Sequence, residues 1–308
     1  MTRAILMTLA LTSTAFAATE NLTLAAPTAT LKGTLLLPEG QGPFPVALII
    51  AGSGPTDRDG NNPLAGKNNS LKMLAEGLAE KGIASLRYDK RGIGESAIPN
   101  LKEEDQSFDD FVQDASNWLD LLKKDQRFNR HFILGHSEGA LIGLAVAKQN
   151  PVDRYVSIAG TGINAADLLL QQLKPQLPEP LFQKSADLID LLKAGKTGPV
   201  PDPALAALFR PSVQPYLISW FKYDPAQLLA GLRTPTLIVQ GDRDLQVGVQ
   251  NAEILQKAKP DAQVLMVPTM NHVLKSAPQD PQGNLATYSN PDLPLADGLL
   301  QGIVEFLK

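Results

Sequence analysis

Short apolar runs alternate with helical segments along most of the chain, and this order constrains the fold more than any other feature. The runs are rich in Val, Ile and Leu, as in strands that are buried on both faces of a sheet. They occupy residues 30–37, 46–50, 83–88, 131–134, 155–159, 236–240 and 263–267, and segments with helical spacing occupy 70–81, 107–124, 138–149, 249–258 and 295–307. This order predicts an α/β fold with a mainly parallel sheet, helices on both faces, and the first run as an edge strand.

One segment interrupts the alternation. Residues 161–232 are rich in Leu and Pro and contain several short helical stretches, but no run typical of a strand. The length of 308 residues exceeds the usual size of one domain, although α/β folds often reach it with an insertion. We therefore expect a single domain over residues 18–308, with residues 161–232 inserted as a helical cap.

The first seventeen residues have the pattern of an export signal. Arg3 precedes a short apolar run, and Ala15 and Ala17 place small residues where signal peptidase requires them. The apolar run is too short to span a bilayer, so we expect no stable membrane insertion once it is removed. The pattern predicts a signal peptide over residues 1–17, cleavage after Ala17, and a periplasmic or secreted protein.

Composition narrows the possible functions. Hydrophobic residues make up 44% and charged residues 19% of the chain, as in ordinary globular proteins. The formal net charge of -4 argues against a nucleic-acid partner, because phosphate contacts need clustered positive charge. The chain has no cysteine, which excludes disulfides and thiolate-bound metals. The oligomeric state is left open by the sequence.

The motif Gly135-His136-Ser137-Glu138-Gly139 matches G-x-S-x-G and lies between the run 131–134 and the helical segment 138–149. At such a strand-to-helix corner, the serine adopts a strained backbone conformation that projects its hydroxyl. The small flanking residues let strand and helix approach each other. The pattern alone arises easily by chance, but its place at this corner makes Ser137 the predicted nucleophile.

A serine nucleophile requires a base, and the chain offers three histidines. His136 adjoins Ser137 and is expected to point elsewhere, while His131 lies toward the far end of the same strand. His272 follows the run 263–267, at the carboxyl edge of the sheet where a base belongs. Elimination therefore predicts His272 as the base.

The imidazole in turn needs a carboxylate to fix its tautomer and stabilise its protonated form. Asp242 and Asp244 both follow the run 236–240, and either one satisfies this requirement by position. The other would then serve as a turn-capping residue.

Two backbone N–H groups should stabilise the oxyanion of a tetrahedral intermediate. One is expected from Glu138, the residue after the nucleophile. The other is expected from the loop after the run 46–50, where Gly52-Ser53-Gly54 lets the backbone approach a substrate closely. Ser53 is the predicted donor, with Gly54 as the alternative. This chemistry implies no cofactor and no metal.

The mature chain resembles the α/β-hydrolase superfamily, and within it bacterial serine esterases related to dienelactone-hydrolase-like enzymes. Three stretches carry the resemblance: residues 52–60 (GSGPTDRDG), residues 87–96 (RYDKRGIGES), and Asn271-His272. The pattern over residues 235–244 is similar to the acid loop of that superfamily, which favours Asp244 over Asp242. The chain order Ser137, Asp244, His272 is also that of the superfamily.

The resemblance implies the α/β-hydrolase fold and hydrolysis of carboxylic esters through an acyl-enzyme on Ser137. The expected partner is a small-molecule acyl ester. A peptidase or thioesterase of the same fold, or a binding protein without catalytic activity, are the alternatives.

Two groups of residues are open to two interpretations. Charged loop residues are expected to form bracing ion pairs rather than to bind substrate; they are Arg58, Asp59, Asp89 and Arg91. Aromatic residues of the cap either line an acyl pocket or pack the cap onto the core; they are Phe182, Phe209, Tyr216, Trp220, Phe221 and Tyr223.

Overall fold

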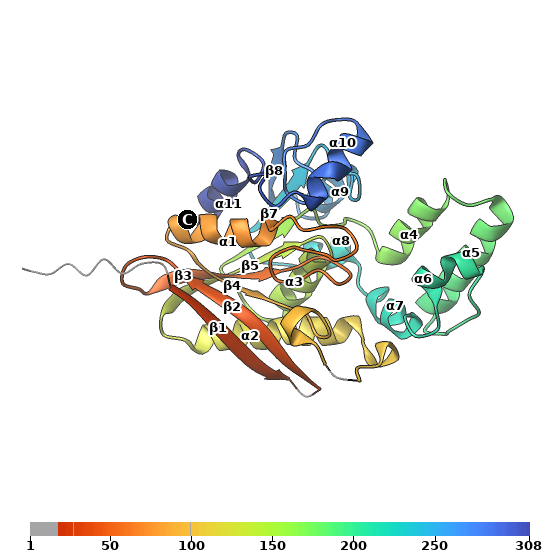
Figure 1. Ribbon diagram of the computed structural model, residues 1–308, viewed down its shortest axis with the longest axis horizontal. Coiled ribbons are helices and arrows are strands. Elements are labelled where there is room, and N and C mark those ends of the chain that lie inside the picture. Colours follow the sequence, from red (N-terminus) through yellow and green to blue (C-terminus); the bar gives the residue numbers. More distant parts are fainter. Residues whose placement is uncertain (1–17, 27, 99) are drawn as a thin grey trace, which may run out of the picture.

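The computed structural model describes residues 18–26, 28–98 and 100–308, so the expected signal peptide lies outside the described residues. Within them, eight strands form one sheet in the order β1-β2-β4-β3-β5-β6-β7-β8 (Figure 1). The strands are β1 (Ala18–Ala26), β2 (Ala29–Leu37), β3 (Phe44–Ile50), β4 (Ala84–Tyr88), β5 (Phe128–His136), β6 (Arg154–Ile158), β7 (Thr236–Gly241) and β8 (Gln263–Val267). Every neighbouring pair in the stretch β4-β3-β5-β6-β7-β8 is parallel, which confirms the predicted α/β class.

The edge strand differs from the sequence prediction. Residues 29–37 form β2, which is covered by β1 along its whole length in an antiparallel pair. The true edge strand, β1, alternates exposed and half-buried residues and has no fully buried position. Because it buries so little apolar surface, its sequence lacks the continuous apolar run of an interior strand.

Helices cover both faces of the sheet. On one face, α1 (Ser70–Glu80) and α11 (Leu299–Leu307) share an apolar cluster with the sheet. On the other, α2 (Phe108–Lys124), α3 (Glu138–Gln149) and α9 (Gln250–Ala258) form a second cluster. Helix α2 begins at a capping box formed by Ser107 and Asp110. Its buried Asp114 binds Arg91 at 2.7 Å, which is a bracing contact rather than a substrate contact.

The cap projects beyond the sheet in Figure 1 as a group of short helices. It contains α4 (Ala165–Leu173), α5 (Glu179–Lys193), η3 (Pro203–Leu205), α6 (Ala206–Phe209), α7 (Gln214–Trp220) and α8 (Pro225–Ala230). Its helices have an apolar cluster of their own, in which Leu188, Ile189 and Phe209 are buried. None of the helices in the described part of the chain is long and apolar enough to cross a membrane.

Two loops at the carboxyl edge of the sheet interlock through buried charges. The β3 loop (residues 51–69) carries Arg58 and Asp59, and the β4 loop (residues 89–96) begins with Asp89. Arg58 binds Asp89 at 2.6 Å, and Asp59 binds Arg87 of β4 at 3.0 Å. Arg58 and Asp89 are both buried. These contacts brace the loops, as expected for Arg58, Asp59 and Asp89, and the fourth residue of that prediction, Arg91, makes its bracing contact with Asp114.

Removal of one charge from this brace should destabilise the protein. In Asp89→Asn, the guanidinium of Arg58 stays buried but loses its buried carboxylate partner and keeps only the exposed Glu95, so we expect the free energy of unfolding to fall by about 3 kcal/mol. Urea denaturation measures this change. The control is Glu76→Gln, which breaks an exposed pair with Lys72 and should cost about 0.5 kcal/mol or less. Equal losses in the two variants would contradict the bracing role.

Candidate active site

Ser137 lies at the sharp corner between β5 and α3. Its backbone angles are φ 55° and ψ -120°, a strained conformation for a residue with a side chain. The corner is closely packed, because a Cβ atom on Gly135 would lie 2.2 Å from the carbonyl oxygen of Gly139. A Cβ atom on Gly139 would lie 2.3 Å from the carbonyl oxygen of Ile50. Both glycines of the motif are therefore required by close contact, and this contact holds Ser137 in its strained position.

Asp244 and His272 meet at the same edge of the sheet, after β7 and β8. The Nδ1 atom of His272 donates to Oδ2 of Asp244 at 2.8 Å, and both side chains are buried. Burial alone would raise the pKa of Asp244, but the charge and hydrogen bond of His272 outweigh it, with help from backbone N–H groups of Val247 and Gln246. The pKa of Asp244 is therefore below its usual value. Because the ionised Asp244 carboxylate accepts the hydrogen bond from Nδ1, Nε2 of His272 is available for proton transfer.

Asp242 has a different role. Its carboxylate accepts a hydrogen bond from the backbone N–H of Thr269 at 2.7 Å, and its side chain is half exposed. This contact ties the loop after β7 to the loop after β8. The structure thus places Asp244 against His272 and gives Asp242 the turn-bracing position.

His136 supports His272, a contact that the sequence did not reveal. Its Nε2 atom lies 2.8 Å from the carbonyl oxygen of His272, and the two rings are 4.9 Å apart. Burial lowers the pKa of His136 to about 3, and the charge of His272 lowers it as well. A neutral ring at ordinary pH donates its Nε2–H to the His272 carbonyl and so fixes the backbone that carries the base. His131 lies elsewhere, near the carbonyl oxygen of Leu122.

The β3 loop passes directly over Ser137. A Cβ atom on Gly52 would lie 3.2 Å from Cβ of Ser137 and 3.3 Å from Nδ1 of His136. Within the described residues, the hydrogen bonds of His272 go to Asp244 and His136, and none joins it to the Ser137 hydroxyl. Contacts between a serine and its base often tighten only when substrate is bound.

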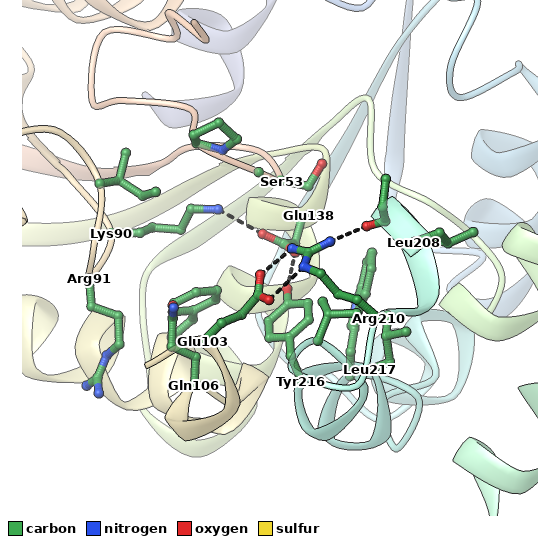
Figure 2. Close-up of a pocket in the computed structure, with 17 residues that line it drawn as sticks. Ser53, Lys90, Arg91, Glu103, Gln106, Glu138, Leu208, Arg210, Tyr216 and Leu217 are labelled. Carbon is green, nitrogen blue, oxygen red and sulfur yellow. Dashed lines mark hydrogen bonds and ion pairs between the residues drawn. The ribbon is translucent and has the colours of Figure 1, made fainter. Parts of the chain in front are cut away.

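A cavity of about 370 Å³ lies between the core loops and the cap, as Figure 2 shows. Ser53, Gly54 and Glu138 line its core side, so both predicted oxyanion donors adjoin it. Glu138 is the first residue of α3, where backbone N–H groups have no partner within the helix. The cavity therefore begins at Glu138, the residue after Ser137, and extends toward the cap, and Ser137 itself is not among its lining residues.

The walls of this cavity are mainly apolar. Phe111 of α2 and Leu208, Leu217 and Trp220 of the cap contribute to them. Of the six cap aromatics in question, Tyr216 and Trp220 line the cavity, whereas Phe209 and Phe221 are buried in the cap cluster.

Among the lining residues that the structure describes, the carboxylates are those of Glu103 and Glu138. Each is paired with a cation (Figure 2). Glu138 binds Lys90 at 2.9 Å, and Glu103 accepts from Nε of Arg210 in the cap at 2.7 Å. The cavity therefore presents apolar surface and neutralised charge.

Comparison with known proteins agrees with this architecture. Residues 65–185 match the family model of the S33 serine aminopeptidases. Esterase EstD of Thermotoga maritima is 30% identical over 249 residues, which cover 80% of this chain and 58% of that protein. The chain thus spans little more than half the length of this relative.

Solved structures show the same fold at low sequence identity. Est1E of Butyrivibrio proteoclasticus, with ferulic acid bound, superposes with a TM-score of 0.60 at 18% identity, covering 92% of this chain and 95% of that chain. Proline iminopeptidase of Mycobacterium smegmatis gives a TM-score of 0.56 at 15% identity, covering 82% and 92%.

The parallel sheet, the strained serine corner and the Asp–His pair at its carboxyl edge are the features of an α/β-hydrolase. The chain therefore has the α/β-hydrolase fold. Its sequence is similar to an esterase and, over residues 65–185, to the family model of the S33 serine aminopeptidases.

The two aspartates after β7 offer a matched test of the site. Asp244→Asn should slow the reaction of Ser137 with a fluorophosphonate probe by about 100-fold or more, because an amide no longer holds the imidazole in the required tautomer. Asp242→Asn, two residues away, should react within about three-fold of the wild-type rate, because its carboxylate contacts only the Thr269 backbone and Arg243.

Intact-protein mass spectrometry measures the labelling rate, and Ser137→Ala provides the unlabelled baseline. Equal slowing in both aspartate variants would contradict the assignment of Asp244.

Proposed function

We propose that this protein is a serine-dependent carboxylic-ester hydrolase with a Ser137–Asp244–His272 triad. The observation that carries the proposal is the buried Asp244–His272 hydrogen bond, 2.8 Å long, at the sheet edge where Ser137 is held in a strained turn. The similarity to esterase EstD over most of this chain supports it. The substrate is a small molecule with an apolar acyl group.

The reaction proceeds through an acyl-enzyme. Ser137 Oγ attacks the ester carbonyl carbon while Nε2 of His272 takes the hydroxyl proton. The backbone N–H groups of Ser53 and Glu138 hold the oxyanion of the tetrahedral intermediate. The C–O bond to the alcohol then breaks, and His272 returns the proton to the leaving oxygen. Water, activated by His272, releases the carboxylic acid from Ser137 in the same way.

The cavity favours a neutral acyl group over the N-terminus of a peptide. An aminopeptidase must bind the α-ammonium group of its substrate, and a carboxylate is the natural partner for that charge. Glu103 and Glu138 already neutralise Arg210 and Lys90, while the remaining walls are mainly apolar. Burial of an ammonium group beside apolar walls without a countercharge is costly. The S33 match makes peptide cleavage the second candidate for testing.

A substrate panel tests the reaction class. Wild-type protein should hydrolyse p-nitrophenyl esters of short and medium acyl chains, and Ser137→Ala should lose about 1,000-fold or more of kcat. Aminoacyl p-nitroanilides are assayed in parallel. Cleavage of the anilides without ester turnover would favour the aminopeptidase, and equal ester rates in wild type and Ser137→Ala would refute serine catalysis.

We also propose export with cleavage after Ala17. Cleavage there would leave β1 whole, because that strand begins at Ala18. Expression of the full chain in a bacterium should yield a periplasmic protein whose intact mass corresponds to Ala18 as its first residue. Ala17→Phe should block processing by placing a large side chain at the cleavage site. A full-length mass for the wild-type protein would contradict cleavage.

A further inference from the structure

A buried ion pair lies at the base of the cavity, next to the nucleophile. Lys90 Nζ is 2.9 Å from Oε2 of Glu138 and 2.6 Å from the carbonyl oxygen of Gly52. The Lys90 and Glu138 side chains are 2% and 3% exposed, and Figure 2 shows them pointing toward each other. Buried pairs of this kind add little net stability compared with apolar residues. The position of the pair therefore calls for an explanation other than stability.

The position of Lys90 determines the direction of one peptide unit. The carbonyl of Gly52 and the N–H of Ser53 belong to the same trans peptide, whose C=O and N–H point in opposite directions. Because Lys90 holds the carbonyl, the Ser53 N–H points away from the ammonium group. Gly52 is also the residue that lies against Ser137. Lys90 thus orients a backbone donor beside the nucleophile.

The same contact makes that donor stronger. An ammonium group that donates to a carbonyl oxygen draws electron density from the amide, and linked hydrogen bonds strengthen each other by roughly 10–30%. Burial increases the effect, since little water reaches the pair to screen its charge. Phe111 covers the ammonium group from another side, with its ring centre 5.2 Å from Nζ.

Lys90 also connects the two residues that supply the oxyanion donors. One donor is the N–H of Ser53, on the peptide that Lys90 holds, and the other is the N–H of Glu138, whose side chain binds Lys90. The second carboxylate oxygen of Glu138 accepts a hydrogen bond from the hydroxyl of Tyr216 in the cap. The contacts form a continuous path from the cap through Glu138 and Lys90 to the β3 loop.

We propose that Lys90 is a positioning residue of the oxyanion site, which orients and polarises the Gly52–Ser53 peptide. Glu138 supplies the countercharge that keeps the ammonium group in this buried place, and Tyr216 fixes the Glu138 carboxylate. Lys90 acts on the reaction through this peptide and transfers no proton. The inference rests on the proposed ester hydrolysis, because it concerns the oxyanion formed in that reaction.

The test must remove the ammonium group without leaving a buried charge. Lys90→Met alone strands the Glu138 carboxylate and destabilises the fold for that reason. We therefore compare two double variants, Lys90→Gln/Glu138→Gln and Lys90→Met/Glu138→Gln. Both lack the two buried charges and keep the backbone N–H of residue 138, but only the Lys90→Met double variant lacks a donor to the Gly52 carbonyl. Thermal unfolding checks that each variant is folded.

The expected effect of the substitutions is on the stabilisation of the oxyanion. Relative to wild type, Lys90→Met/Glu138→Gln should lose about 10- to 100-fold in kcat on p-nitrophenyl esters, with KM within about two-fold, because the contact acts on charge that develops in the transition state. Lys90→Gln/Glu138→Gln retains a neutral donor at this position and should give an intermediate kcat.

A thionoester provides a readout that a purely structural role would not change. Sulfur is a weak hydrogen-bond acceptor, so a functioning oxyanion site favours an oxygen ester over the matched thionoester. Lys90→Met/Glu138→Gln should lose about five-fold or more of this preference for the oxygen ester, because the Ser53 donor that distinguishes oxygen from sulfur is weakened.

The outcomes separate this inference from the proposed function. Equal kcat values and equal oxygen-to-sulfur ratios in the wild type and both double variants overturn the role of Lys90 while serine-dependent ester hydrolysis stands. A rise in KM alone, with an unchanged ratio, assigns Lys90 to cavity shape and also overturns the role. Absence of ester turnover in the wild type refutes the proposed function and this inference together.

Discussion

The candidate site depends on charged contacts that join the β3 loop to β4 and the β4 loop. Loops lack the hydrogen-bond ladders of strands, so side-chain contacts must fix their positions. Because β3 and β4 are neighbouring parallel strands, the two loops leave the sheet side by side. Arg58–Asp89, Asp59–Arg87 and the Lys90–Gly52 contact then join them at three points. Residues 52–60 and 87–96, two of the stretches that carry the resemblance to α/β-hydrolases, therefore form a single structural unit.

This unit works together with the strained corner at Ser137. A residue held in such a conformation costs about 1–3 kcal/mol, and it persists only where its surroundings permit no alternative. Here the backbone N–H of Ser137 donates to the carbonyl of Ile158 at 2.9 Å, and the Gly139 contact with Ile50 locks the helix onto β3. The reacting hydroxyl and the loop above it are therefore set by the rigid sheet, while the mainly apolar wall opposite them comes from the cap.

The sequence predicted the parts of the molecule whose signals are local. Interior strands such as β3 and β7 have continuous apolar runs because both of their faces are buried, and the G-x-S-x-G corner has a short motif. The half-exposed β1 and the short helix α10 (Pro281–Ala286) leave no comparable pattern. Asp242 and Asp244 follow the same strand, so position alone does not separate them; the family resemblance favours Asp244, and its contact with His272 agrees. The contacts of His136 and Lys90 join residues distant in the chain, and no periodicity reveals them.

Both variable positions of the G-x-S-x-G motif hold residues whose side chains make supporting contacts. His136 holds the backbone of the base, and Glu138 holds Lys90. For protein engineering, the five residues from Gly135 to Gly139 therefore offer little freedom to vary. Leu208, Leu217 and Trp220 face the same cavity from the cap through apolar side chains. Directed evolution has its widest choice of substitutions at those three positions, where the size of a side chain changes without disturbing the polar groups around Ser137.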